Sequence, residues 1–246
     1  MRINIKFTFS GILTLPVNYN NLIQAFFYSH ISDVKERVRL HDYGYMVGPK
    51  KIKLMTFSKI FGKFKMENKN ILFNSPINII FSAYDDELVS EIAYNILTDE
   101  NLYINGMKLQ VMDIKSELFN DDHYTNSRHY MIEMLSPLTV FRSEDKKRIY
   151  YDPWSNEFEK LIKSNIETKL KAINGNGMKI MNFHIRPNNI KNKHDEKIVY
   201  FKDTFIKCFN GLFTIEADPS IMKLIYYAGI GSKNSEGFGC IKILGV

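Results

Sequence analysis

The order of apolar periodicities in the first half of the chain is the feature that most restricts its fold. Residues 3–9 alternate between apolar and polar side chains, which is the period of a half-buried strand. Apolar residues then recur at helical spacing from Asn20 to about Val38, with Asn20 or Asn21 available as the N-cap. The remaining segments are two β-rich stretches at 53–61 and 70–81, a helix from the acidic start at 85–87 to about Asp99, and a strand at 102–114 that turns at Asn105-Gly106. This half therefore predicts the order β-α-β-β-α-β.

The second half begins in the same way. A strand at 130–141 precedes a helix whose 3.6-residue period ends at Asn174-Gly175. Strands at 178–185, 198–209 and 212–217, a short helix at 218–228 and a closing strand at 239–244 follow. With one extra strand the order repeats, so we predict an α+β protein of two tandem ferredoxin-like (RRM-like) βαββαβ domains, residues 1–118 and 119–246.

Composition limits the environment and the partner. With 33 Lys+Arg against 27 Asp+Glu among 246 residues, the chain carries a net charge of +6, which makes a polyanionic partner worth considering. Two cysteines, Cys208 and Cys240, are too few for a disulfide framework. No apolar stretch is long enough to span a membrane, and the N-terminus lacks the pattern of a signal peptide. We expect a cytoplasmic protein without a membrane partner.

The most informative segment lies between the last helix and the last strand, and it contains Gly229, Gly231, Gly237 and Gly239. A loop with so many residues that lack a Cβ is able to bring backbone amides close to a phosphate. The structural alternative is a connection that needs positive φ angles. On the binding interpretation, a bulky residue at Gly237 weakens RNA binding more than stability. The spacing matches neither the P-loop nor the dinucleotide-binding pattern, and residues 237–243 follow the RNP1 pattern without its stacking aromatics, since Cys240 and Ile243 stand in their place.

These glycines, spaced Gly229-x-Gly231-x5-Gly237-Phe238-Gly239, close a basic chain with two predicted ferredoxin-like units. In this the chain resembles the CRISPR repeat-processing endoribonucleases of the RAMP superfamily, which cut precursor CRISPR RNA (crRNA) within each repeat. The resemblance extends to residues 27–31, to His41 and to residues 53–58. Over about 85–200 it covers only the order of the elements.

The resemblance implies an RNase that needs no metal or other cofactor, with CRISPR repeat RNA as its partner and a 2′,3′-cyclic phosphate and a 5′-OH as product ends. His41 takes the position of the family's histidine, Tyr28 that of its tyrosine and Lys53 that of its lysine. Five neighbours remain alternatives for these positions: His30, Tyr43, Tyr45, Lys50 and Lys51.

The chemistry of these residue types agrees with that implication. Cleavage by the ribose 2′-OH needs a base, an acid for the leaving oxygen and a cation for the phosphorane charge. His41 lies in the densest cationic stretch of the chain, which attracts phosphate and lowers the histidine pKa. The structural alternatives are a surface role for His41 and a packing or capping role for His30. No acidic cluster has a partner histidine at metal-ligand spacing.

Candidate RNA contacts lie in two segments of the second half of the chain. In the glycine-rich segment they include Ser232, Lys233 and Phe238 beside the four glycines, and between two predicted strands they are Arg186, Lys191 and Lys193. A rival hypothesis is a non-catalytic RAMP subunit that holds crRNA in an effector complex, whose other subunits are then candidate partners. A histidine in the first domain favours the enzyme. Monomer and homodimer are both left open.

Overall fold

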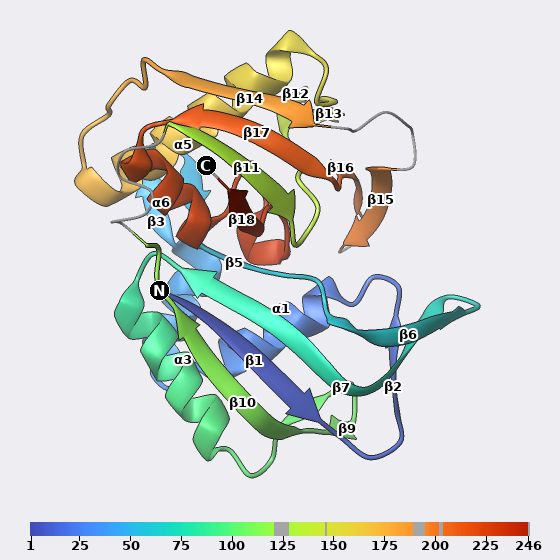
Figure 1. Ribbon diagram of the computed structural model, residues 1–246. Coiled ribbons are helices and arrows are strands. Elements are labelled where there is room, and N and C mark those ends of the chain that lie inside the picture. The colour runs from blue at the N-terminus through green and yellow to red at the C-terminus, as the bar shows by residue number, and fades with distance from the viewer. Residues whose placement is uncertain (121–127, 146, 189–194, 202–203, 246) are drawn as a thin grey trace.

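The structure is a computed structural model that describes residues 1–120, 128–145, 147–188, 195–201 and 204–245, without the side chains of His41 and Tyr43. Two lobes, each built on an antiparallel sheet, lie one above the other (Figure 1). The chain crosses between them after β10, and the C-terminal strand lies in the upper lobe with the N-terminus at the junction (Figure 1).

The lower lobe has the strand order of a ferredoxin-like domain. Its first strand, β1 (Arg2–Thr8), lies between β10 (Gln110–Glu117) and β7 (Asn70–Ala83). Along one edge β7 pairs with β1 and then β2 (Ile12–Pro16), and along the other with β5 (Met55–Phe57) and β6 (Phe61–Glu67). The strands that match the ferredoxin pattern therefore lie in the order fourth, first, third, second.

The core of this lobe follows from the alternation in β1. Ile3, Ile5 and Phe7 share one face and are buried against α1 (Asn20–Ser29) and α3 (Asp86–Thr98). The predicted acidic start of the second helix is confirmed, since the Asp85 carboxylate accepts hydrogen bonds from the amides of Glu87 and Leu88.

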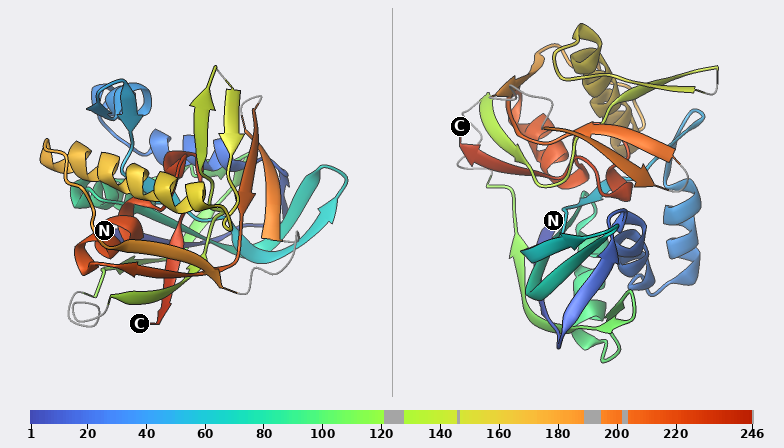
Figure 2. Two further views of the ribbon diagram at one scale, coloured as in Figure 1. Left: turned by 90° about the horizontal axis from the view of Figure 1, so that it is seen from above. Right: turned by 90° about the vertical axis from the view of Figure 1, so that its right-hand side faces the viewer.

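The upper lobe repeats the pattern with β18 (Ile241–Gly245), β11 (His129–Met134), β17 (Leu212–Ala217) and β14 (Phe183–Asn188) side by side in that order. The long helix α5 (Asn156–Asn174) and α6 (Pro219–Ala228) cover one face of this sheet (Figure 2). Gly175 closes α5 in the left-handed conformation, φ 72°, as its position predicts. The tandem ferredoxin-like fold is confirmed, whereas the division at residues 118 and 119 remains a prediction.

Short two-stranded hairpins lie outside the two main sheets. The turn at Asn105-Gly106 forms as predicted, with φ values of 48° and 79°. The hairpins pair β3 (Tyr45–Val47) with β4 (Lys50–Ile52), β8 (Tyr103–Ile104) with β9 (Met107–Lys108), β12 (Phe141–Glu144) with β13 (Lys147–Tyr150), and β15 (Glu196–Phe201) with β16 (Thr204–Phe209).

Several predicted bounds are wrong, for local reasons. The helix expected to run to Val38 stops at Ser29, because Asp33 caps a separate helix α2 (Val34–Val38). The strand expected at 130–141 ends at Met134, before Pro137, which has no amide for a ladder. The strand expected at 198–209 is the β15–β16 hairpin, and the one expected at 178–185 starts only at Phe183.

The two lobes are joined by buried contacts. Arg2 is 1% exposed; its guanidinium donates to the carbonyls of Tyr226 at 2.6 Å and Ile241 at 2.9 Å. Leu54 is a member of the upper core, and Tyr45 and Ile52 pack against that core. The segment that follows α2 is therefore part of both lobes. Within the described part of the chain, no helix combines the length and the apolar character needed to cross a membrane.

Candidate functional site

The glycine-rich loop, residues 229–240, lies at the junction of the lobes and owes its glycines to close packing. Gly229, Gly231, Gly237 and Gly239 all have positive φ, between 72° and 83°. A Cβ at Gly237 would lie 2.4 Å from the Phe57 ring, and one at Gly239 would lie 1.9 Å from the Ile230 carbonyl oxygen. Only glycine fits these positions without a shift of the neighbouring atoms.

Asn234 organises the interior of this loop. Its side-chain amide donates to the carbonyls of Ile230 at 2.9 Å and Phe238 at 3.0 Å. A Cβ at Gly229 or Gly239 would come within 2.7 Å of that amide nitrogen. Two of the four glycines therefore make room for one asparagine side chain.

Lys169 of α5 supports the same loop from the side of the upper lobe. Its ammonium donates to the Gly229 carbonyl at 2.6 Å and to Asn234 Oδ1 at 2.7 Å, and the residue is 2% exposed. Burial lowers the pKa of Lys169 to about 7. Our sequence interpretation missed this residue, although a signal was present: with Phe158, Ile162 and Ile166 it occupies the buried face of α5 at helical spacing.

Side chains of the lower lobe donate hydrogen bonds to backbone carbonyls of the loop. Asn20 donates to the Glu236 carbonyl at 2.9 Å, Gln24 to that of Ser235 at 2.6 Å, and Thr56 to that of Phe238 at 3.0 Å. The expectation that Asn20 or Asn21 caps the first helix is wrong, because Tyr19 occupies that position. The side-chain amide of Asn20 donates a hydrogen bond to the loop instead.

Few side chains of the loop reach solvent. Ser232, Lys233, Ser235 and Glu236 are half-buried, while the four glycines are buried. Phe238 is completely buried with Phe201, Ile206 and Cys208, so its ring packs inside the protein rather than facing RNA. Within the loop, the side chains that reach the surface are those of residues 232, 233, 235 and 236.

Tyr28 and Lys53 come together from different elements. The Lys53 ammonium lies 5.7 Å from the centroid of the Tyr28 ring, within range of a cation–π interaction. Tyr28 is 6% exposed, and burial, followed by the charge of Asp42, raises the pKa of its phenol well above the usual range. The phenol is therefore protonated near neutral pH and is suited to donate a hydrogen bond rather than to act as a base.

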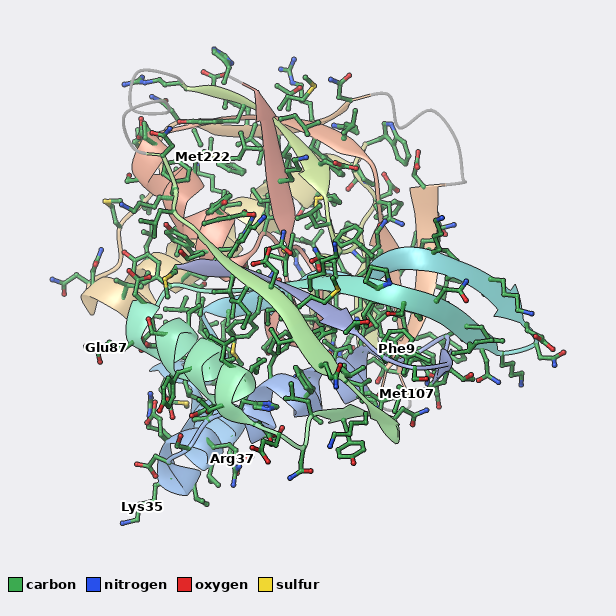
Figure 3. The ribbon with its side chains drawn as sticks, turned by 60° about the horizontal axis from the view of Figure 1, so that its bottom comes forward. Phe9, Lys35, Arg37, Glu87, Met107 and Met222 are labelled. Atoms are coloured by element: carbon green, nitrogen blue, oxygen red, sulfur yellow. The ribbon has the colours of Figure 1, made fainter. Side chains whose placement is uncertain are left out.

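His41 lies on a short π-helical turn, η1 (Arg39–Tyr43), directly after α2. Its side chain and that of Tyr43 are outside the described residues. Gly44 ends the turn at φ 59°, where a Cβ would lie 2.4 Å from the Ile52 carbonyl oxygen, so the chain doubles back tightly into β3 and β4. Figure 3 shows Lys35 and Arg37 on the neighbouring helix α2, at the outer side of the lower lobe.

The alternatives to these three residues have different surroundings. His30 is 8% exposed; its Nδ1 lies 2.7 Å from the Phe26 carbonyl oxygen and its Nε2 lies 3.4 Å from the Asp99 carboxylate. These contacts fit the packing role considered for His30. Tyr45 is half-buried with the Arg39 guanidinium 5.8 Å from its ring, and Lys50 and Lys51 are exposed on β4.

A basic pocket of about 340 Å³ joins the two groups of candidates. Lys51 and Lys53 line it from the lower lobe, and Lys233 and Glu236 from the loop. The second-domain wall consists of Phe141, Arg148, Asn165 and Lys169. With its five basic side chains protonated and its one carboxylate ionised, the lining has a formal charge of +4. A concave surface of this charge concentrates anions.

Other predicted contacts lie elsewhere. Arg186 is exposed on β14, the edge strand of the upper sheet, and lines a separate surface depression with Trp154 and His184. Lys191 and Lys193 are outside the described residues. In the part of the chain that is described, no three His, Cys, Asp or Glu side chains are grouped so as to hold a metal ion.

Comparisons with known proteins identify the fold and the family. The family model "CRISPR associated protein Cas6, C-terminal" matches residues 119–243. CRISPR-associated endoribonuclease Cas6 1 of Methanocaldococcus jannaschii is 23% identical over 258 aligned positions, which cover 98% of this chain and 92% of that protein. A solved structure of a CRISPR associated protein Cas6 has a TM-score of 0.77 at 20% identity and covers 99% of both chains. The product of a Cas6-related gene from Pyrococcus furiosus has a TM-score of 0.79 at 21% identity, covering 99% of this chain and 98% of its own.

Proposed function

This chain belongs to the CRISPR-associated Cas6 family, and we propose that it is an endoribonuclease that binds CRISPR repeat RNA and cleaves precursor crRNA. The observation that carries the proposal is the position of Lys53. Its ammonium faces the Tyr28 ring and also lines the basic pocket to which the glycine-rich loop contributes Lys233. One cation thus connects the candidate catalytic residues to the candidate RNA-binding surface.

The proposed reaction is an attack by the 2′-oxygen on the adjacent phosphorus, without a metal ion. The bond from the 2′-oxygen to phosphorus forms, the bond from phosphorus to the 5′-oxygen breaks, and the products carry a 2′,3′-cyclic phosphate and a 5′-OH. A base removes the 2′-OH proton, an acid protonates the departing 5′-oxygen, and a cation stabilises the phosphorane.

We assign the cation to Lys53 and the proton transfer to His41. The π-helical turn that carries His41 ends at Tyr43, ten residues before Lys53, and β5 begins two residues after Lys53. Histidine titrates near neutral pH and serves as either base or acid. The phenol of Tyr28, held protonated by its raised pKa, is assigned to orient the phosphate or the attacking ribose.

We also propose that Ser232 and Lys233 contact the RNA backbone, because their side chains reach the surface of the loop beside this pocket. The glycines act indirectly in this proposal: they allow the loop to fold around Asn234 and against Phe57. Arg186 is assigned to a more distant part of the RNA, and Lys191 and Lys193 remain candidate RNA contacts on the ground of sequence alone.

The test uses two RNAs of the repeat sequence, one natural and one with a single 2′-deoxy nucleotide at the scissile position, both in EDTA. Natural RNA should be cut at one bond, and the deoxy RNA should bind equally but stay intact, because it lacks the attacking atom. Cleavage of the deoxy RNA, or cleavage that needs an added divalent ion, would exclude this mechanism.

A binding-only subunit gives a different result in the same experiment. It binds both RNAs with equal affinity and cuts neither. That outcome would replace the enzyme by the crRNA-holding role.

A further inference from the structure

The second-domain wall of the basic pocket carries positive charge that no described carboxylate neutralises. Lys169 donates only to neutral oxygens, those of Gly229, Asn234 and Ala228. Among the described residues, no carboxylate lies within ion-pair distance of Lys169 or Arg148. A buried ammonium without a counter-charge costs several kcal/mol, so it points to an anionic ligand.

Arg148 lines the same pocket as Lys169. It is exposed on β13, and its guanidinium lies 5.4 Å from the centroid of the Phe141 ring, which also lines the pocket. The contact with Phe141 restricts the guanidinium, whose planar fork of donors matches the oxygens of a phosphate.

The other charged groups that face Lys169 across this space are Lys51, Lys53 and Lys233, with Glu236 as the one acid among the described lining residues. Glu236 is already engaged, since its carboxylate accepts from the Lys233 ammonium at 2.6 Å. The charge of the second-domain wall itself belongs to Lys169 on α5 and Arg148 on β13.

We propose that this wall is a phosphate subsite: Arg148 contacts one internucleotide phosphate of the bound RNA, and Lys169 adds positive charge to the same wall and fixes the loop through Asn234. The inference rests on the proposed function and adds a site in the second domain, apart from the candidate catalytic residues. A bound backbone phosphate here would anchor the strand next to Lys53.

The experiment compares Arg148→Ala with Arg142→Ala, its matched control on the same hairpin. Arg142 does not line the pocket and is paired with Glu157 at 2.8 Å. With repeat RNA, Arg148→Ala should weaken binding about tenfold at 0.1 M salt, the size expected for one charge-assisted contact. The slope of log K against log salt should fall by about 0.7, the value for one phosphate of a single strand. Arg142→Ala should change affinity less than about twofold and leave the slope unchanged.

A second measurement identifies the phosphate. Replacing single phosphates by neutral methylphosphonates should, at one position, weaken the wild-type protein about tenfold but leave Arg148→Ala nearly unaffected, since that contact is already lost. Equal affinities of the two variants, an unchanged salt slope, or no position with such coupling would overturn the subsite. If the wild-type protein neither bound nor cut repeat RNA, the proposed function itself would fail.

Discussion

The glycine-rich loop and the segment from Arg39 to Lys53 border the same basic pocket, but they are built in opposite ways. Most of the loop is buried, and its carbonyls accept hydrogen bonds from α1, β5 and α5. The segment is a short π-helical turn and a two-stranded hairpin, with Lys50 and Lys51 exposed. The difference indicates that the loop is a structural joint between the lobes, while the segment has the freedom to carry chemistry. Changes in the loop should therefore affect stability, and changes in the segment should affect rate.

The largest effect is expected from Gly237→Val. The new Cβ would lie 2.4 Å from the Phe57 ring at a φ of 83°, so strain and overpacking should lower the free energy of unfolding by about 3 kcal/mol. The matched control is Gly48→Val, at φ 57° with no atom within 4 Å of the Cβ, for which about 1 kcal/mol is expected. Urea unfolding of both variants measures the difference. Equal losses would remove the packing role assigned to the loop.

This expectation reverses the one drawn from sequence. From the sequence, Gly237 is expected to matter more for RNA binding than for stability. Because Gly237 packs against Phe57 and Asn20, we expect its substitution to affect stability more than RNA binding. A Gly237→Val variant that melts normally and binds RNA weakly would restore the earlier interpretation.

His41→Ala tests the other region. Loss of a general acid or base should lower the single-turnover cleavage rate by about 10²-fold or more while RNA affinity and melting temperature stay near the wild type. His184→Ala is the control, because His184 is exposed on β14 beside Glu159 and does not line the basic pocket. An undiminished rate for His41→Ala would remove His41 from the mechanism.

The sequence predicts these two regions unequally well. Alternation in β1 and the Asp85 cap are local signals, and local signals gave both lobes their element order. The glycine-rich loop is equally visible, but its partners are not: Thr56 and Phe238 are 182 residues apart in the chain. No periodicity reports a contact over such a separation.

Lys169 shows the same limit from another side. A lysine on the apolar face of a helix is visible in the sequence, yet nothing there indicates that its ammonium reaches Gly229 and Asn234. Hairpins were missed for a related reason. Residues 198–209 have a composition typical of a strand throughout. Only the antiparallel pairing of β15 with β16 reveals that the chain reverses within this stretch.

A smaller effect is expected from Tyr28→Phe. The change keeps the ring near the Lys53 ammonium and removes the hydroxyl, so the cleavage rate should fall about tenfold, the worth of one hydrogen bond in the transition state. Since the pKa of Tyr28 is raised, the pH–rate profile between pH 6 and about 9 should keep its shape in the variant. Tyr45→Phe is the control, and an equal loss in both variants would remove the specific role of Tyr28.

The smallest effect concerns the charge of Lys169, whose ammonium donates to the loop. The pKa of Lys169 is lowered to about 7, below that of an unfolded lysine near 10.4, so between these values the unfolded chain binds the extra proton. This group therefore makes the free energy of unfolding rise with pH through that window, by about 1 kcal/mol from pH 7 to about 8. Lys169→Met should be less stable at every pH, because Gly229 and Asn234 lose their donor, and its stability should lack this rise. Urea unfolding at the two pH values measures both. The same pH dependence in the variant and the wild type would mean that Lys169 keeps its proton in the folded protein, with its hydrogen-bond acceptors outweighing its burial.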